Sequence, residues 1–245
     1  MSRTASPAAT AAPDALHARA SSVARFAAGL SLALGGLLNG LPPYIGSLLA
    51  GDFDSFADSI EWGMQHPVWW GFEQSAILVS VLFIPLGLLG IAQVTRHRSP
   101  WLSGIGLVMA LWGMWGFHNL LATGYLVGTT TPGTVGVDAA LALNDAMASD
   151  PGILIMGLLP HLVGSSVGII LLMIAAWRSR VFSRIACALV LAFIVWDFLL
   201  PTFGPAEPHI LLVVGWVWLG IQIMRMPREV WSGSILVSRP EETTA

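Results

Sequence analysis

The sequence is poor in charge and in cysteine. Only 10% of its 245 residues are charged, and lysine is absent, whereas about 25% charged residues are usual in soluble proteins. The net charge of −3 argues against a nucleic-acid partner, which requires a basic face. Cys187 is the only cysteine, so an intrachain disulfide and a Cys-pair metal or redox motif are excluded. With a mean hydropathy of +0.74, the chain is interpreted as an integral membrane protein whose main partner is the lipid bilayer.

Long apolar runs predict six transmembrane helices. A bilayer core requires about 20 mostly apolar residues per helix, and such runs cover residues 26–50, 68–94, 101–127, 152–177, 182–203 and 209–224. We therefore expect an all-α integral membrane fold, a bundle of six transmembrane helices within residues 25–226. A disordered N-terminal tail (1–24) and a C-terminal tail (227–245) would flank this domain.

The arginines predict the orientation of the bundle. All 11 arginines fall before the first span, between spans two and three, between spans four and five, or after span six. A six-span topology places these four segments on one side, and the opposite loops carry acidic residues and no arginine. Because cytoplasmic loops concentrate Arg and Lys, we predict a multi-pass protein of the cytoplasmic membrane with both termini in the cytoplasm.

Four ionisable residues stand inside the predicted spans: Glu73, His118, His161 and Asp197. A rise of 1.5 Å per residue places the two carboxylates about 8–9 Å, and the two histidines about 13 Å, below the outer ends of their spans. Ionisable residues inside a span cost free energy and are functional candidates by default. The sequence therefore predicts an aromatic-walled pocket that opens to the outer side, with these four groups at its floor.

Three kinds of chemistry fit such a pocket. Two imidazoles and two carboxylates are a feasible ligand set for a transition metal, so Glu73, His118, His161 and Asp197 are all candidate metal ligands. His118 and His161 are also candidate cofactor-binding residues that would hold a haem from both sides. Without a metal, Glu73 or Asp197, kept protonated by the apolar surroundings, would be the catalytic acid for a small-molecule or lipid ligand entering from the outer leaflet. No motif of a named enzyme family is present, so the sequence leaves open whether the protein is an enzyme.

Two alternatives remain beside the pocket. In a non-catalytic structural or partner subunit, the polar layer would only tie the helices together. In a proton- or metal-coupled transporter, the same groups would form a relay. A relay requires polar groups in the inner half of the membrane, where the sequence offers only Ser80, Gln93, Ser103 and Gln222, and no internal repeat is visible.

Glycine and proline add expectations about packing. Gly164 and Gly168 form a GxxxG pattern, which predicts a close helix contact within the bundle. Pro42–Pro43 is expected to break the first span near its outer end. Pro160 frees the backbone carbonyl four residues earlier, and a freed carbonyl at membrane depth needs a partner. Short surface helices are expected in the two longer outer loops, at 54–66 and 137–147, as a lid or as solvated connectors.

Overall fold

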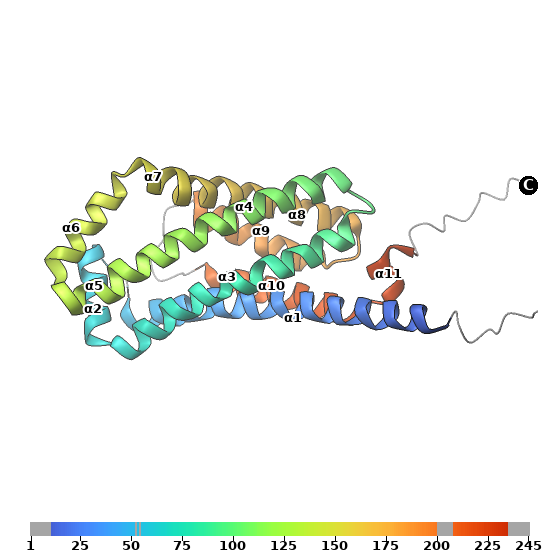
Figure 1. Ribbon diagram of the computed structural model, residues 1–245, viewed down its shortest axis with the longest axis horizontal. Helices are drawn as coiled ribbons and strands as arrows, with labels where there is room; N and C mark the ends of the chain where they lie inside the picture. The colour runs from blue at the N-terminus through green and yellow to red at the C-terminus, as the bar shows by residue number, and fades with distance from the viewer. Residues whose placement is uncertain (1–10, 52, 54, 200–207, 235–245) are drawn as a thin grey trace, which may run out of the picture.

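The computed structural model is a bundle of long helices with smaller helices at one end (Figure 1). It describes residues 11–51, 53, 55–199 and 208–234, and within these ranges every regular element is a helix. The elements are α1 (Ala11–Ala50), α2 (Phe56–Gln65), α3 (Pro67–Thr95), α4 (Pro100–Tyr125), η2 (Leu126–Thr130), α5 (Thr131–Val135), α6 (Val137–Ala148), α7 (Pro151–Ile153), η3 (Leu154–Leu158), η4 (Pro160–Ser165), α8 (Ser166–Ser179), α9 (Arg184–Leu199), α10 (His209–Arg225) and α11 (Arg228–Ser232). The predicted all-helical fold is confirmed.

Four helical segments are long and apolar enough to cross a membrane. They are Arg19–Ala50, Pro67–Thr95, Pro100–Val135 and Pro151–Ser179, and they coincide with the first four predicted spans. Two shorter helices, α9 of 16 residues and α10 of 17, occupy the places of the fifth and sixth. The helices are thus compatible with a multi-pass membrane protein.

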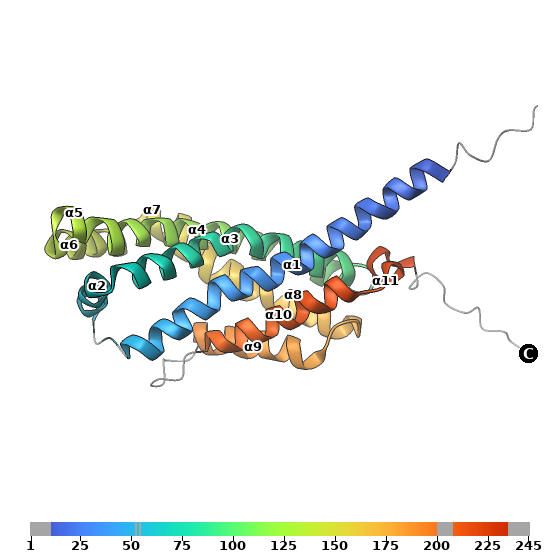
Figure 2. The ribbon, with the colours of Figure 1, turned by 90° about the horizontal axis from the view of Figure 1, so that it is seen from below.

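The long helices pack as a closed ring. α1 lies between α3 and α10, α4 contacts α3 and the η4–α8 segment, and α9 lies between α8 and α10. The order around the ring is therefore α1, α3, α4, α8, α9 and α10, and the helices run side by side in both ribbon views (Figure 2). Fully buried aliphatic side chains fill the interior, including Leu32, Leu88, Ile91, Leu172 and Leu219.

Glycines allow the closest of these contacts. A Cβ atom added at Gly113 of α4 would lie 2.1 Å from the backbone nitrogen of Ser165, and one added at Gly164 would lie 2.6 Å from the backbone nitrogen of Gly113. One added at Gly168 would lie 2.2 Å from the backbone nitrogen of Ala110. The helix contact predicted from Gly164 and Gly168 is therefore formed inside the bundle, against α4.

The first helix differs from its predicted form. It begins at Ala11, so part of the segment expected to be a disordered tail is helical; residues 1–10 lie outside the described residues. The expected break at Pro42–Pro43 is wrong, because α1 continues through both prolines to Ala50. A proline inside a helix removes one backbone hydrogen bond, and contacts of α1 with α3 and α10 hold the helix on both sides.

The two helices predicted in the outer loops are present as α2 and α6, and they pack together. α2, η2, α5 and α6 contact one another and form a cap at one end of the bundle, seen at the left of Figure 1. Ile60 of α2 and Ala140 of α6 are fully buried. The Trp70 indole N–H donates to the Gly128 carbonyl at 3.2 Å, which joins α3 to this cap.

The arginines of the described residues, Arg19 to Arg228, lie toward the opposite end of the bundle. The α3–α4 and α8–α9 turns and α11 lie there, and the first turns of α1 extend beyond them (Figure 2). The Arg25 guanidinium donates to the Met226 carbonyl, and the Arg98 guanidinium donates to the Ser179 carbonyl. Arginine side chains thus close the helix ends on this side by binding free backbone carbonyls.

Candidate functional site

His161 lies in a π-helical turn, η4. π-Helical turns are rare and often occur at functional sites. Pro160 has no N–H to donate to the carbonyl of Met156, and the Asn119 side chain of α4 donates to that carbonyl instead, at 2.9 Å. The prediction that the carbonyl freed by Pro160 needs a partner is therefore confirmed.

Two phenyl rings and a hydroxyl hold the His161 imidazole. The ring stacks on Phe117 of α4, with centroids 4.5 Å apart and an interplanar angle of 16°. Phe198 of α9 contacts it at a centroid distance of 5.4 Å. Its Nδ1 lies 3.3 Å from the hydroxyl of Ser165, one turn further along η4. The imidazole is therefore fixed in orientation and half-buried.

A cavity of about 80 Å³ adjoins His161 at the centre of the ring. Every helix of the ring contributes to its lining, and polar groups come from four of them: Asn39 of α1, His161 and Ser165 of η4, Asp197 of α9 and His209 of α10. The rest of the wall is apolar, with the aromatic side chains of Phe117, Phe193, Phe198 and Trp216 beside Ile84, Met114, Ile169, Ile194 and Leu212. The predicted aromatic-walled pocket with imidazole and carboxylate groups has a counterpart in this cavity.

Trp216 supplies a polar group that lacks a partner. Its side chain is only 2% exposed, and its indole N–H is buried with no hydrogen-bond acceptor in the described part of the chain. A buried donor without an acceptor costs about 1–3 kcal/mol. A ligand with an acceptor atom, or a water, that reached this group would recover that cost.

Glu73 lies outside the central cavity. Its carboxylate accepts from the Trp69 indole N–H at 3.1 Å, and a Cβ atom added at Gly46 of α1 would lie only 2.4 Å from its Oε2. The residue is buried where α3 meets α1, and it is not among the residues that line the central cavity.

His118 points away from the cavity. Its side chain is exposed on the surface of the bundle, whereas Phe117 beside it lines the cavity. The structure therefore brings together two of the four predicted residues, His161 and Asp197. Within the described residues, no group of three or more His, Cys, Asp and Glu side chains is arranged to hold a metal ion.

Sequence reasoning missed three members of the cavity wall. It assigned none of Asn39, His209 and Trp216 to the pocket. An asparagine in the middle of an apolar run, and a histidine at the start of one, were the available signals. Whether these side chains face the centre of the ring depends on how α1 and α10 pack, which the sequence alone does not give.

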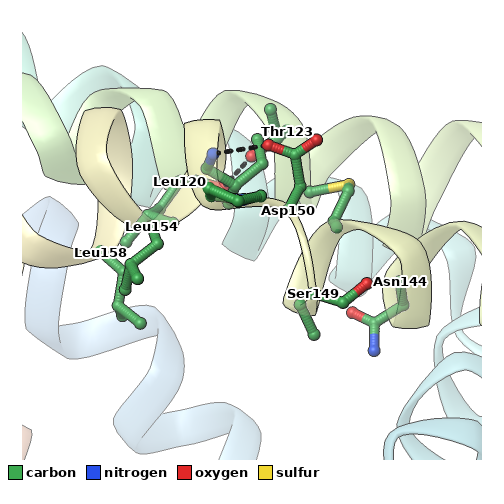
Figure 3. Close-up of a pocket in the computed structure, with 12 residues that line it drawn as sticks. Leu120, Thr123, Asn144, Ser149, Asp150, Leu154 and Leu158 are labelled. Carbon is green, nitrogen blue, oxygen red and sulfur yellow. Dashed lines mark hydrogen bonds between the residues drawn. The ribbon is translucent and has the colours of Figure 1, made fainter.

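A wider groove of about 390 Å³ lies between α4, α6 and α7. Its polar landmark is Asp150, whose carboxylate accepts from the backbone N–H groups of Gly152 at 2.6 Å and Ile153 at 3.2 Å (Figure 3). This carboxylate caps a helix. The central cavity gathers more chemically versatile groups, so it is the better candidate site.

Comparisons of the chain with protein-family models, with curated proteins and with solved structures found no match.

Proposed function

We propose that the chain crosses the cytoplasmic membrane six times with both termini in the cytoplasm. The gathering of arginines at one end of the bundle supports this orientation. At 1.5 Å per residue, α9 and α10 are about 24–25 Å long, which is close to the thickness of a hydrocarbon core. Reporter fusions at the C-terminus and in α6 test it, since only the fusion in α6 should be active outside the cytoplasm.

The central cavity would then open toward the outer side. Asp197 is exposed and lies in the last turn of α9, and His209 is the first residue of α10. Both helix ends are at the end of the bundle opposite the arginines. Toward the arginine end, buried side chains such as Leu88 and Leu219 fill the interior. This arrangement favours a binding pocket over a continuous transport path.

We propose that the pocket binds a small organic cation, and the cavity lining is the observation that carries this proposal. The Asp197 carboxylate supplies negative charge, and the faces of aromatic rings attract cations. The cavity volume of about 80 Å³ favours a ligand of a few non-hydrogen atoms. Methylammonium, dimethylammonium and ethylammonium have this size and charge.

A matched pair of carboxylate variants tests the proposal. Isothermal titration of the purified protein with dimethylammonium should give a Kd that weakens about ten- to a hundred-fold in Asp197→Asn, the value of one hydrogen bond to a charged group. Glu73→Gln removes a carboxylate that is buried outside the cavity and should leave this Kd unchanged. Tetramethylammonium, which is bulkier and has no N–H to donate to the carboxylate, should bind more weakly. Equal losses in both variants, or no binding to the wild type, would refute the proposal.

A transition metal is a weaker candidate ligand: two imidazoles and a carboxylate line the same cavity, but no three such side chains of the described residues are arranged to hold a metal ion. Elemental analysis of the purified protein separates the two. A stoichiometric metal that is lost in His161→Ala but retained in His118→Ala would favour the metal. A haem has little support, because His118 faces outward and the cavity is far below the 300–1,000 Å³ of pockets that enclose organic ligands.

A purely structural role and transport of the cation predict different outcomes of stability and uptake measurements. If the polar groups only tied helices together, Asp197→Asn would lower the free energy of unfolding and no ligand would raise it. If the protein transported the cation, liposomes containing it would take up labelled methylammonium, and Asp197→Asn would abolish the uptake.

A further inference from the structure

A second groove lies at the arginine end of the bundle, and its lining shares no residue with that of the central cavity. It has a volume of about 550 Å³ and is formed by the α8–α9 turn, the last turns of α10, and α11. Two guanidinium groups, Arg180 and Arg225, line it, and its lining contains no carboxylate. Among the described residues, the lining of the groove therefore carries net positive charge.

The groove is charged at one end and apolar along its length. Trp218 lies seven residues before Arg225 on α10, about 10 Å further from the arginine end. Trp218 and Ile221 are partly exposed, at 39% and 37%, and Val230 of α11 completes the apolar wall. A molecule that fits this lining carries an anion at one end and an apolar chain at the other.

The walls of the groove are held in place. The backbone N–H of Ser183 in the α8–α9 turn donates to Oε1 of Gln222 on α10 at 3.1 Å, and Gln222 itself lines the groove. Arg180 has φ +58°, the only non-glycine residue of the described chain in the left-handed region, where side-chain-bearing residues are uncommon. The turn keeps this conformation while presenting a guanidinium to the groove.

We propose that this groove binds the phosphate headgroup of an anionic phospholipid of the cytoplasmic leaflet. Basic pockets between transmembrane helices on the cytoplasmic side bind such headgroups, and guanidinium groups pair well with phosphate. The phosphate lies between Arg180 and Arg225, and an acyl chain runs along Trp218 and Ile221. The site requires the membrane orientation proposed above, and it does not depend on what the central cavity binds.

Native mass spectrometry of the full-length protein tests the site. Protein purified in detergent is mixed with phosphatidylglycerol or phosphatidylcholine of the same acyl chains. Each basic residue near a membrane surface strengthens the binding of an anionic lipid about five-fold. With two arginines, the wild type should therefore retain phosphatidylglycerol about thirty-fold more strongly than phosphatidylcholine. The variant Arg180→Gln/Arg225→Gln should lose this preference, and Arg180→Lys/Arg225→Lys should keep most of it.

The control removes the same charge from the same end of the bundle. Arg96→Gln/Arg178→Gln leaves the groove lining intact and should retain phosphatidylglycerol like the wild type. An equal loss in this control would mean general charge attraction and would overturn the site. Equal retention of the two lipids by the wild type would overturn it without any variant. Displacement by millimolar inorganic phosphate would identify a free anion site instead of a lipid site. Because the reporter fusions measure orientation separately, a failure of the site can be distinguished from a failure of the proposed topology.

Discussion

Replacing Gly113 by alanine should separate α4 from η4 and damage the central cavity. The new Cβ would lie 2.1 Å from the backbone nitrogen of Ser165 and 2.5 Å from its Oγ. Ordinary carbon contacts begin near 3.5 Å, so the two segments would have to move apart by more than about 1 Å. Rotamer changes cannot relieve the clash, because the first atom met belongs to the backbone.

The magnitude follows from two opposing effects. Overpacking of a tight contact costs about 1–3 kcal/mol, and more when two backbones must separate. Alanine in place of glycine inside a helix returns about 1 kcal/mol. We therefore expect a net loss of about 1–2 kcal/mol in the free energy of unfolding. Because Phe117 of α4 stacks on His161 of η4, the same movement should also weaken ligand binding in the cavity.

The assay is reversible unfolding in mixed micelles, with dimethylammonium titration on the folded protein. Gly104→Ala is the control, since it changes a glycine on the same helix where an added Cβ would meet no atom within 4 Å. It should be neutral or slightly stabilising. If Gly113→Ala were as stable as Gly104→Ala and bound the ligand as the wild type does, the close approach of α4 and η4 would be refuted.

Two hydrogen bonds between helices give further predictions. Asn119→Ala should lower the free energy of unfolding by about 0.6–2 kcal/mol, because it leaves the Met156 carbonyl unpaired; an unchanged stability would contradict the role given to this amide. Trp70→Phe keeps the ring but loses the bond to the Gly128 carbonyl, so amide hydrogen exchange in 126–135 should accelerate about two- to ten-fold. Trp101→Phe, at a side chain 81% exposed, should not change that exchange, and equal effects of the two would rule out the bond as the cause.

Much of the fold could be predicted because it depends on properties that are local in sequence. The apolar runs located the long helices to within a few residues, except at the start of α1, which begins at Ala11 and not at residue 26, since a helix in lipid must satisfy its own backbone. The prediction that the Met156 carbonyl needs another partner followed from the missing N–H of Pro160. The break at Pro42–Pro43 did not occur, because tertiary contacts on both sides of α1 outweigh one lost hydrogen bond.

The site was only partly predictable, because the sequence gives the depth of a side chain in the membrane but not the direction in which that side chain points. Position in a span gives the depth of a side chain, and all four ionisable residues were placed by depth. Direction depends on which face of the helix packs inward. On α4 the buried stripe runs through Gly106, Ala110 and Gly113, and it continues to Phe117 at the cavity. His118 is one residue further, about 100° around the helix, and so it faces outward. The small residues of this stripe were the sequence signal for that face.

The same packing that builds the bundle also builds the pocket. Pro160 and the π-helical turn change the faces that this segment presents, and the close approach at Gly113 brings Phe117 onto the imidazole of His161. The Trp216 N–H is buried in the cavity wall without an acceptor in the described chain, as are the Trp196 N–H and the Thr129 hydroxyl outside the cavity. An ammonium ion has only donors to offer, so in the proposed complex a water in the cavity would accept from this N–H beside the cation.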